Sequence, residues 1–337
     1  MEYISNKRVK IEISGVVQGV GFRPFVYQLA LQHSLKGYVF NNGNGVVIEL
    51  EGEQSQFDAF LSSMTTSLPT LSRIDTLQIT EIPIKKSSTF SIIKSTNTDV
   101  KTMVSADISM CPDCKKEMNE PKNRRYKYPF INCTNCGPRY TIINALPYDR
   151  KNTSMQNFEM CDACKKEYED PLNRRFHAQP ISCYDCGPKL SFSQLTHDHI
   201  SKDEDLIEIF SQYIKQGRSV ALKGIGGFHI VCDATNEKAV AALRINKHRP
   251  TKPLAVMFKN ITAIKKMCRI NKKEEALILS KERPIVLVNK KKISKIAKSI
   301  APNIDKIGVF LPYAPLHELL LNRLDCPIVA TSANLSD

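Results

Sequence analysis

Hydrophobic and polar positions alternate at the start of the chain. Val9, Ile11 and Ile13 are separated by charged residues, a period of two that predicts a half-buried strand. A helix with an apolar stripe that includes Phe25 and Leu29 follows. The next predicted elements are strands over 36–40 and 46–52, a helix over 54–67, and strands over 77–82 and 90–93. This βαββαβ order predicts a split βαβ sandwich over residues 1–94.

The last part of the chain, residues 200–337, mixes helical and strand patterns. DEDLIEIFSQYIKQG predicts a helix, because its apolar residues fall on one face and Gly217 is placed to end it. A strand SVALK, a tight turn GIGG and a helix over 236–246 follow. PIVLV (284–288) and PIVATSAN (327–334) contain continuous apolar runs, which are typical of buried strands. The fold class expected for the whole chain is therefore multidomain α/β.

Two cysteine modules lie between these parts, in residues 108–190, after a polar linker over 95–107. Each module has two C-x-x-C pairs separated by 18 residues, and each cysteine recurs 50 positions later. The cysteines are Cys111, Cys114, Cys133, Cys136, Cys161, Cys164, Cys183 and Cys186. Four thiolates fill the tetrahedral shell of zinc and leave no open position, so we predict two structural zinc sites. A disulfide framework is the alternative. Spacing leaves open whether the pairs combine within each module or in a nested order, as in a DnaJ-like finger.

Composition narrows the class of protein. With 337 residues, 42% of them hydrophobic, the chain can form two or three domains with ordinary cores. It has no apolar run of the roughly 18 residues needed to cross a membrane, and its N-terminus has no signal-peptide core. We therefore expect a cytoplasmic protein. The net charge of +14 fits weak RNA binding, a solvated basic surface, or a field that attracts phosphorylated small molecules.

A glycine-rich turn precedes the first predicted helix. Its residues are Gln18, Gly19, Val20, Gly21 and Phe22. Such a loop presents backbone N–H groups and the positive end of the helix dipole to an anion. Arg23 adds a guanidinium fork for phosphate or carboxylate oxygens. The simpler interpretation is a strand–turn–helix with a surface arginine.

Polar residues in the last part of the chain indicate a nucleotide site. Lys247 and Arg249 precede a proline and must project from a loop, where two fixed cations suit a triphosphate or an adenylate. An exposed basic turn is the alternative. Ser332 and Asn334 follow a predicted strand and carry small polar groups suited to phosphate or ribose.

The start of the chain also resembles a known family. GVVQGVGFRPFV, followed 18 residues after Arg23 by Asn41 in GYVFNNGNG, is similar to the signature of acylphosphatases. The resemblance covers the whole first segment and implies a ferredoxin-like fold. It implies that Arg23 and the loop amides hold the phosphate of an acyl phosphate. Asn41 would orient the attacking water.

A second resemblance covers the last part. KGIGG, KHRPTKPLAVM, LPYAPLH and TSANLS together resemble the YrdC/Sua5 domain, which binds ATP and makes carbamoyl-type adenylates. The nucleotide-binding residues that it implies are Lys247, Arg249, Ser332 and Asn334, with Lys223 and His229 as further candidates. Mg²⁺ is expected at the triphosphate. The chain ends a few residues after TSAN, so this domain is expected to be truncated.

The sequence segments around the cysteines give the most specific resemblance. RRYKYPFINCTNCGPRYTI and DPLNRRFHAQPISCYDCGP, with the acylphosphatase-like start, resemble the HypF carbamoyltransferases of nickel–iron hydrogenase maturation. The resemblance implies hydrolysis of carbamoyl phosphate, formation of carbamoyl-adenylate from ATP, and transfer to a HypE-like acceptor. It also implies a kinase-like domain beyond residue 337. The alternatives are a threonylcarbamoyl-adenylate synthase for tRNA modification and a zinc-finger module that binds RNA or protein.

Overall fold

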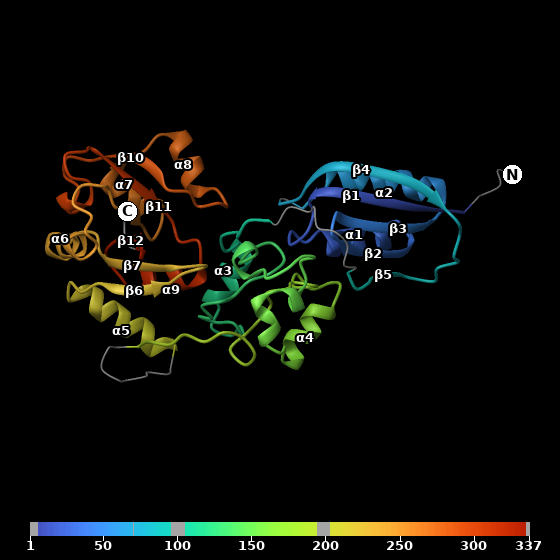
Figure 1. Ribbon diagram of the computed structural model, residues 1–337, viewed down its shortest axis with the longest axis horizontal. Coiled ribbons are helices and arrows are strands. Elements are labelled where there is room, and N and C mark those ends of the chain that lie inside the picture. Colours follow the sequence, from blue (N-terminus) through green and yellow to red (C-terminus); the bar gives the residue numbers. More distant parts are fainter. Residues whose placement is uncertain (1–5, 70, 96–104, 194–202, 335–337) are drawn as a thin grey trace. The chain divides into compact units, whose positions relative to one another are not determined.

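The structure, a computed structural model, describes residues 6–69, 71–95, 105–193 and 203–334 (Figure 1). The chain forms two compact units, residues 1–107 with 132–187 and residues 108–131 with 188–337. Each unit has its own sheet and its own hydrophobic core. Most of the predicted linker over 95–107 lies outside the described residues.

A five-stranded sheet opens the first unit (Figure 1). Its elements are β1 (Lys7–Val16), α1 (Phe22–Gln32), β2 (Lys36–Asn42), β3 (Gly45–Gly52), α2 (Gln54–Thr66), β4 (Arg73–Ile82) and β5 (Phe90–Ile92). The spatial order is β4-β1-β3-β2-β5, antiparallel except for the parallel pair of β2 and β5. Val26 of α1 and Phe57 and Phe60 of α2 are buried in one core with the strands. The elements from β1 to β4 form the expected βαββαβ sandwich, and β5 adds a fifth strand beside β2.

The two cysteine modules share a backbone pattern as well as a sequence pattern. Each begins with a short helix, α3 (Pro112–Asn119) or α4 (Asp162–Glu169), whose N-cap is the first cysteine of the module. Lys127 and His177, at equivalent positions of the repeat, both have positive φ, 56° and 53°. Short 3-10 turns lie at Tyr140–Ile142 (η1), Arg150–Asn152 (η2) and Ser154–Asn157 (η3). The duplication therefore extends from the sequence to the backbone.

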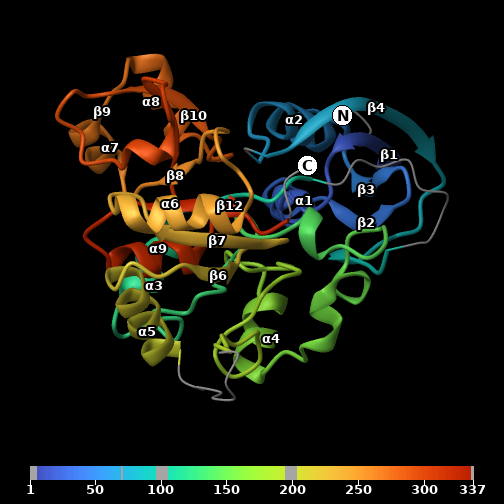
Figure 2. The same cartoon turned by 60° about the vertical axis from the view of Figure 1, so that its left-hand side comes forward.

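A seven-stranded sheet organises the second unit (Figure 2). Its strands are β6 (Val220–Lys223), β7 (Phe228–Asp233), β8 (Val256–Met257), β9 (Cys268–Arg269), β10 (Val286–Lys290), β11 (Lys306–Phe310) and β12 (Ile328–Ser332). Its helices are α5 (Asp203–Lys215), α6 (Glu237–Asn246), α7 (Ile261–Met267), α8 (Lys272–Leu279) and α9 (Pro315–Asn322), with a 3-10 turn η4 at Lys298–Ile300. The spatial order of the strands is β6-β7-β12-β8-β11-β10-β9. Val240, Ile264 and Ile278 bring α6, α7 and α8 into one core with the central strands.

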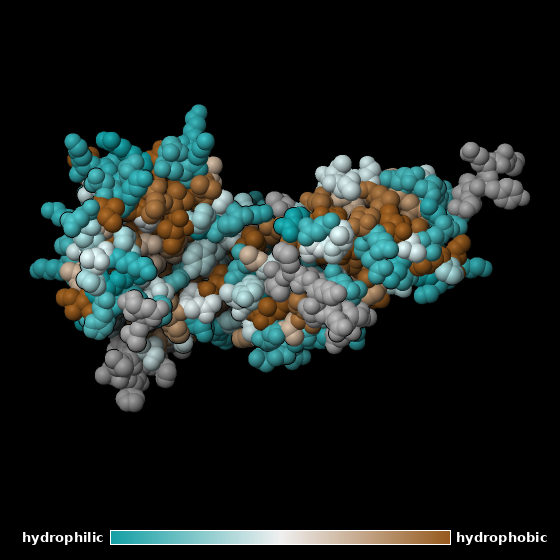
Figure 3. Space-filling view, turned by 45° about the horizontal axis from the view of Figure 1, so that its top comes forward, coloured by the Kyte–Doolittle hydropathy of each residue, from teal (hydrophilic) through white to brown (hydrophobic). Residues whose placement is uncertain are grey.

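The outer part of this sheet departs from expectation. The apolar run PIVLV predicts a strand buried on both faces, but Ile285 and Leu287 are 58% and 63% exposed, while Val288 is fully buried. β10 lies between β11 and the two-residue edge strand β9, so one of its faces meets solvent. Hydrophilic and hydrophobic side chains lie next to each other on the surface (Figure 3). Within the described ranges, no helix is long and apolar enough to cross a membrane.

Candidate functional sites

The loop between β1 and α1 has the backbone of an anion site. Gly19 and Gly21 are left-handed, with φ of 72° and 76°, and Gly21 is the N-cap of α1. No side chain caps this helix end, so its first N–H groups face outward with the positive end of the dipole. A Cβ on Gly19 would lie 2.8 Å from Ser105 Oγ, so the loop has room only for glycine there.

The side chains of the other predicted loop residues hold the loop in place, one through hydrogen bonds and two through burial in the core. Gln18 Nε2 donates to the carbonyl oxygens of Asn42 and Gly45, both at 2.8 Å, and so ties the loop to the turn between β2 and β3. The side chains of Val20 and Phe22 are buried in the core. Only the backbone N–H groups of these two residues can therefore bind an anion.

Arg23 lies in the first turn of α1 and is 8% exposed. Its Nη2 donates to Asp149 Oδ1 at 2.9 Å and to the Tyr148 carbonyl at 3.4 Å, and its Nη1 donates to Ser95 Oγ at 3.5 Å. The simpler interpretation, a surface arginine, is wrong. A guanidinium has five N–H donors, so an ion pair through one nitrogen orients the group and leaves donors for a phosphate.

Asn41, at the end of β2, is the second predicted catalytic residue. Its side chain is 1% exposed, and neither Oδ1 nor Nδ2 has a hydrogen-bond partner within the described ranges. Burying an amide without partners costs free energy, which a polar ligand would recover. Asn41, Arg23 and the glycine loop line one cavity of about 30 Å³. That volume holds a water molecule.

The second half of this cavity wall comes from the cysteine modules. It is lined by Thr134, Arg139, Tyr148, His177 and Gln179. The Tyr148 N–H donates to Gln18 Oε1 at 3.0 Å, so the module segment is bonded directly to the loop. The acylphosphatase-like site is therefore completed by residues outside the βαββαβ sandwich.

Arg139 also joins the cysteine-module segment to the glycine-rich loop. It is 2% exposed, and its Nε donates to the Gly19 carbonyl. Its Nη atoms donate to the carbonyl oxygens of four residues at 2.7 to 3.1 Å: Cys133, Thr134, Cys136 and Pro138. One side chain thus connects the backbone of a C-x-x-C knuckle to the glycine-rich loop.

His177 also faces the cavity. Burial, assisted by the positive charge of Arg23, lowers the pKa of His177 from 6.5 to about 3, so the imidazole is neutral at physiological pH. Its ring packs against Tyr168 and Phe176. It belongs to neither of the two cysteine clusters found among the described residues.

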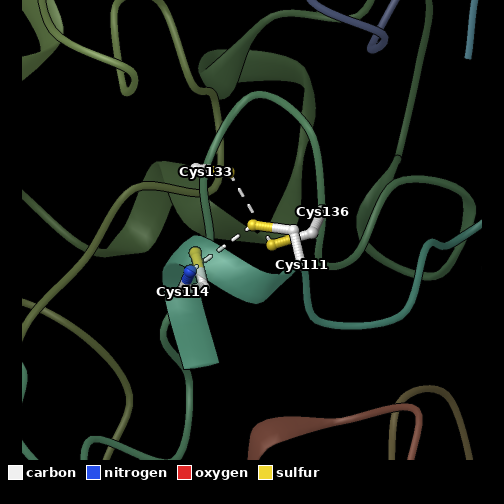
Figure 4. Close-up of side chains that lie close together, drawn as sticks. All are labelled: Cys111, Cys114, Cys133 and Cys136. Atoms are coloured by element: carbon white, nitrogen blue, oxygen red, sulfur yellow. Dashed lines mark hydrogen bonds between the residues drawn. The ribbon is translucent and has the colours of Figure 1, made fainter. Parts of the chain in front are cut away.

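The eight predicted metal ligands form two clusters. One contains Cys111, Cys114, Cys133 and Cys136 (Figure 4), and the other contains Cys161, Cys164, Cys183 and Cys186. Within each cluster all four sulfurs lie within 4.8 Å of one another. The pairs therefore combine within each module, and all cysteines are free of disulfides.

The sulfur spacing fits zinc. Sulfur atoms lie 3.8 Å apart in Cys133 and Cys136 and 3.7 Å apart in Cys161 and Cys183. A tetrahedron with Zn–S bonds of about 2.3 Å has edges of about 3.8 Å. Burial opposes the thiolate of Cys161, but the Cys164 N–H and the neighbouring thiols outweigh it and lower the pKa to about 7. The two clusters fit zinc fingers.

The structure brings the predicted nucleotide residues together at one end of β12. Lys247, the C-cap of α6, is buried, and its Nζ donates to the carbonyl oxygens of Ser332 and Asn334, both at 2.7 Å. Arg249 Nη1 lies 3.4 Å from Thr331 Oγ1. Burial, and then the charge of Arg249, lowers the pKa of Lys247. Two cations and the end of a strand therefore share one site.

Lys223 and His229 lie on the neighbouring strands. β6 pairs with β7 so that Leu222 faces His229, and β7 pairs with β12 so that His229 faces Ser332. His229 is thus beside the nucleotide residues. Lys223 ends β6, and its Nζ lies 5.7 Å from the centre of the Phe228 ring.

Comparison with known families agrees with this layout. Residues 9–92 match the acylphosphatase family, residues 110–143 and 160–193 match the HypF finger, and residues 212–337 match the Sua5/YciO/YrdC family, described as telomere recombination. An acylphosphatase of Leuconostoc mesenteroides is 38% identical over 87 residues, which cover 26% of this chain and 97% of that protein. The fold and the loop at Arg23 therefore define an acylphosphatase domain joined to zinc-finger modules and a Sua5-like domain.

The particular combination identifies the family. The carbamoyltransferase HypF of Synechocystis sp. is 46% identical over 98% of this chain and 43% of its own length. The crystal structure of a full-length HypF in the phosphate- and nucleotide-bound form has a TM-score of 0.93 and 47% identity, covering 99% of this chain and 43% of that one. The chain belongs to the HypF carbamoyltransferase family, and it spans less than half the length of these relatives.

Several residues of these sites could not be found by sequence reasoning. Asp149 and Arg139 lie in LPYDR and CGPRYTI, which contribute to the family resemblance but indicate no role for either residue. An acidic residue and an arginine in a loop do not indicate contacts with a distant strand–helix turn, so only the fold could place them.

Proposed function

We propose that this chain hydrolyses carbamoyl phosphate and adenylates the released carbamate with ATP. These steps would supply a carbamoyl group to a HypE-like acceptor for nickel–iron hydrogenase maturation. One observation carries the proposal: in a chain of the HypF family, a buried Asn41 amide with no hydrogen-bond partner among the described residues shares a cavity with Arg23 and a glycine loop. The full-length HypF relative was crystallised in a phosphate- and nucleotide-bound form, which supports two such sites.

The first reaction requires no covalent nucleophile. The loop amides and Arg23 would hold the phosphoryl group and balance its negative charge. The Asn41 amide would orient a water molecule for in-line attack on phosphorus. A new P–O bond forms, the bond to the carbamoyl oxygen breaks, and its electron pair remains on the carbamate. The phosphate formed carries the oxygen and both protons of the water.

The second reaction would take place at the end of β12. Lys247 and Arg249 supply positive charge for the triphosphate, and Ser332 and Asn334 supply small polar groups for the nucleotide. A carbamate oxygen attacks the α-phosphorus, and pyrophosphate leaves with the electron pair of the broken bond. Mg²⁺ bound with ATP would neutralise part of the triphosphate charge. Zinc, held by eight thiolates, would have no coordination position for substrate and would serve the fold.

The test measures two products with purified full chain. Carbamoyl phosphate should release phosphate, and addition of ATP should yield AMP and pyrophosphate without threonine. Arg23→Ala should lower kcat/KM for phosphate release at least ~100-fold, as expected for loss of a transition-state donor. Arg73→Ala, an exposed arginine of the same sheet, should be unaffected. Full hydrolysis by Arg23→Ala would refute the phosphate site, and threonine-dependent pyrophosphate release would indicate a threonylcarbamoyl-adenylate synthase.

Transfer to a HypE-like acceptor and a cytoplasmic location remain predictions. Thiolate ligands are stable in a reducing compartment, which favours the cytoplasm. Co-purification of the chain with a HypE-like protein, and transfer of ¹⁴C from carbamoyl phosphate to that protein, would test the acceptor.

A further inference from the structure

Two histidines in the second unit have buried ring nitrogens without hydrogen-bond partners among the described residues. His317, on α9, is 0% exposed, and neither of its ring nitrogens has a partner in the described part of the chain. Nδ1 of His229, on β7, is also buried and unpaired there. Such groups are rare in folded proteins, because an apolar side chain of the same size would fill the space at lower cost. Their presence indicates a polar ligand.

The two imidazoles lie in one cluster with a tyrosine. The His317 ring is 4.5 Å from the Tyr313 ring and 6.2 Å from the His229 ring, centre to centre. Gly224 closes the cluster: a Cβ there would lie 3.3 Å from Tyr313 Oη and 3.4 Å from His229 Cε1. The backbone of the GIGG turn thus approaches these rings more closely than most side chains would allow.

The cluster adjoins the proposed nucleotide site. β7 and β12 lie side by side in the sheet (Figure 2), and the register of this antiparallel pair places His229 directly opposite Ser332. Directly opposed residues of such a pair present their side chains on the same face of the sheet. The Ser332 carbonyl in turn accepts a hydrogen bond from Lys247. A group held by the histidines would therefore lie beside the residues proposed to bind ATP.

The chemistry of the cluster selects its ligand. Burial, and then the nearby His229, lowers the pKa of His317 to about 3, and burial lowers the pKa of His229, so both rings are neutral. A neutral imidazole offers one N–H donor and one nitrogen acceptor. Carbamate has the complementary pattern, with N–H donors at one end and oxygen acceptors at the other. An amino acid such as threonine would need charged partners for its ammonium group.

We propose that His229, Tyr313 and His317 form the subsite that binds the carbamate, and so set the specificity of the adenylation. An imidazole nitrogen accepts an N–H of the carbamate, and an imidazole N–H donates to one carbamate oxygen. The other oxygen remains free to attack the α-phosphorus of ATP, which forms the new P–O bond as pyrophosphate leaves. This inference rests on the proposed adenylation.

The experiment supplies carbamate directly, from ammonium carbamate solutions, and so bypasses the phosphate site. ATP–pyrophosphate exchange is measured against carbamate concentration. His317→Phe removes both ring nitrogens but keeps an aromatic ring, and it should raise KM for carbamate at least tenfold with ATP affinity unchanged. His317→Gln restores a donor and an acceptor and should recover most of the loss. His33→Phe, in the first unit, is the control and should behave as wild type.

A binding measurement covers the case in which a variant fails to fold. In ¹⁵N-histidine NMR spectra of the wild-type chain, ammonium carbamate should shift the imidazole signals of His229 and His317. The signals of His248, which is exposed, should stay unchanged. Unshifted His229 and His317 signals, or a His317→Phe variant with wild-type KM, would overturn the subsite while wild-type exchange upheld the adenylation. No exchange in the wild type would refute the adenylation itself.

Discussion

Replacing Asp149 with asparagine tests whether the cysteine-module segment positions Arg23, the proposed catalytic arginine. The Arg23–Asp149 ion pair is 2.9 Å long, and its side chains are only 9% and 17% exposed, so solvent screens it weakly. Hydrogen bonds to charged groups contribute about 1.5–3 kcal/mol. Because about 1.4 kcal/mol is a factor of ten in rate, loss of this orientation should lower kcat for acyl-phosphate hydrolysis roughly 10- to 100-fold.

Substrate affinity should move in the opposite direction. The Asp149 carboxylate competes with phosphate for the Arg23 guanidinium, so its removal should lower the inhibition constant of inorganic phosphate several-fold. The assay compares kcat, KM and phosphate inhibition for wild type, Asp149→Asn and Asp75→Asn. Asp75 pairs with Arg73 at 2.7 Å on the surface of the same sheet, so its substitution should change none of these values.

A lower kcat together with tighter phosphate binding would distinguish a positioning role of Asp149 from a purely structural one. A variant that merely disturbed folding would lose affinity and rate together, and its melting temperature would fall. If Asp149→Asn kept the wild-type kcat, the ion pair would have no part in orienting Arg23, and the assignment would be wrong.

The glycine loop, the cysteine clusters and the buried His317 each allow a further test. Gly19→Ala should reduce phosphate release at least tenfold with zinc content unchanged, because the new Cβ would lie 2.8 Å from Ser105 Oγ at a φ of +72°. Wild-type turnover of this variant would contradict the requirement for glycine in the loop. Denaturation in the presence of a chromogenic chelator should release two zinc ions per chain, one per cluster. Chelation in native conditions should abolish phosphate release. Activity without zinc would contradict the link from the cluster to the loop through Arg139. The low pKa of His317, about 3 against 6.5 for an ordinary histidine, means that the unfolded chain takes up a proton first, so stability should fall as pH drops from about 6.5 toward 3. Urea unfolding at pH ~7 and ~4.5 should show a smaller difference for His317→Phe than for wild type, and an equal difference would contradict the buried neutral ring.

Local patterns explain what could be predicted from the sequence. The alternation in β1, the glycine loop and the C-x-x-C pairs each depend on residues close in the chain, and the structure places them as expected. Contacts across 120 and 126 positions hold Arg139 to Gly19 and Arg23 to Asp149, and no periodicity in a single sequence reports them. Leu287 is also expected from the sequence to be buried but is exposed, because an apolar run does not reveal that its strand lies near the edge of a sheet.

The contacts of Arg139 explain how metal sites without an open position can still affect catalysis. The acylphosphatase of Leuconostoc mesenteroides is matched over 97% of its length by 87 residues of this chain, a match too short to include both cysteine modules. In this chain the Gly19 carbonyl is bound by an arginine whose other donors are all used by the Cys133–Pro138 backbone. Zinc would fix that backbone, the backbone fixes Arg139, and Arg139 fixes the loop. A bound metal would therefore act on the proposed phosphate site through geometry alone.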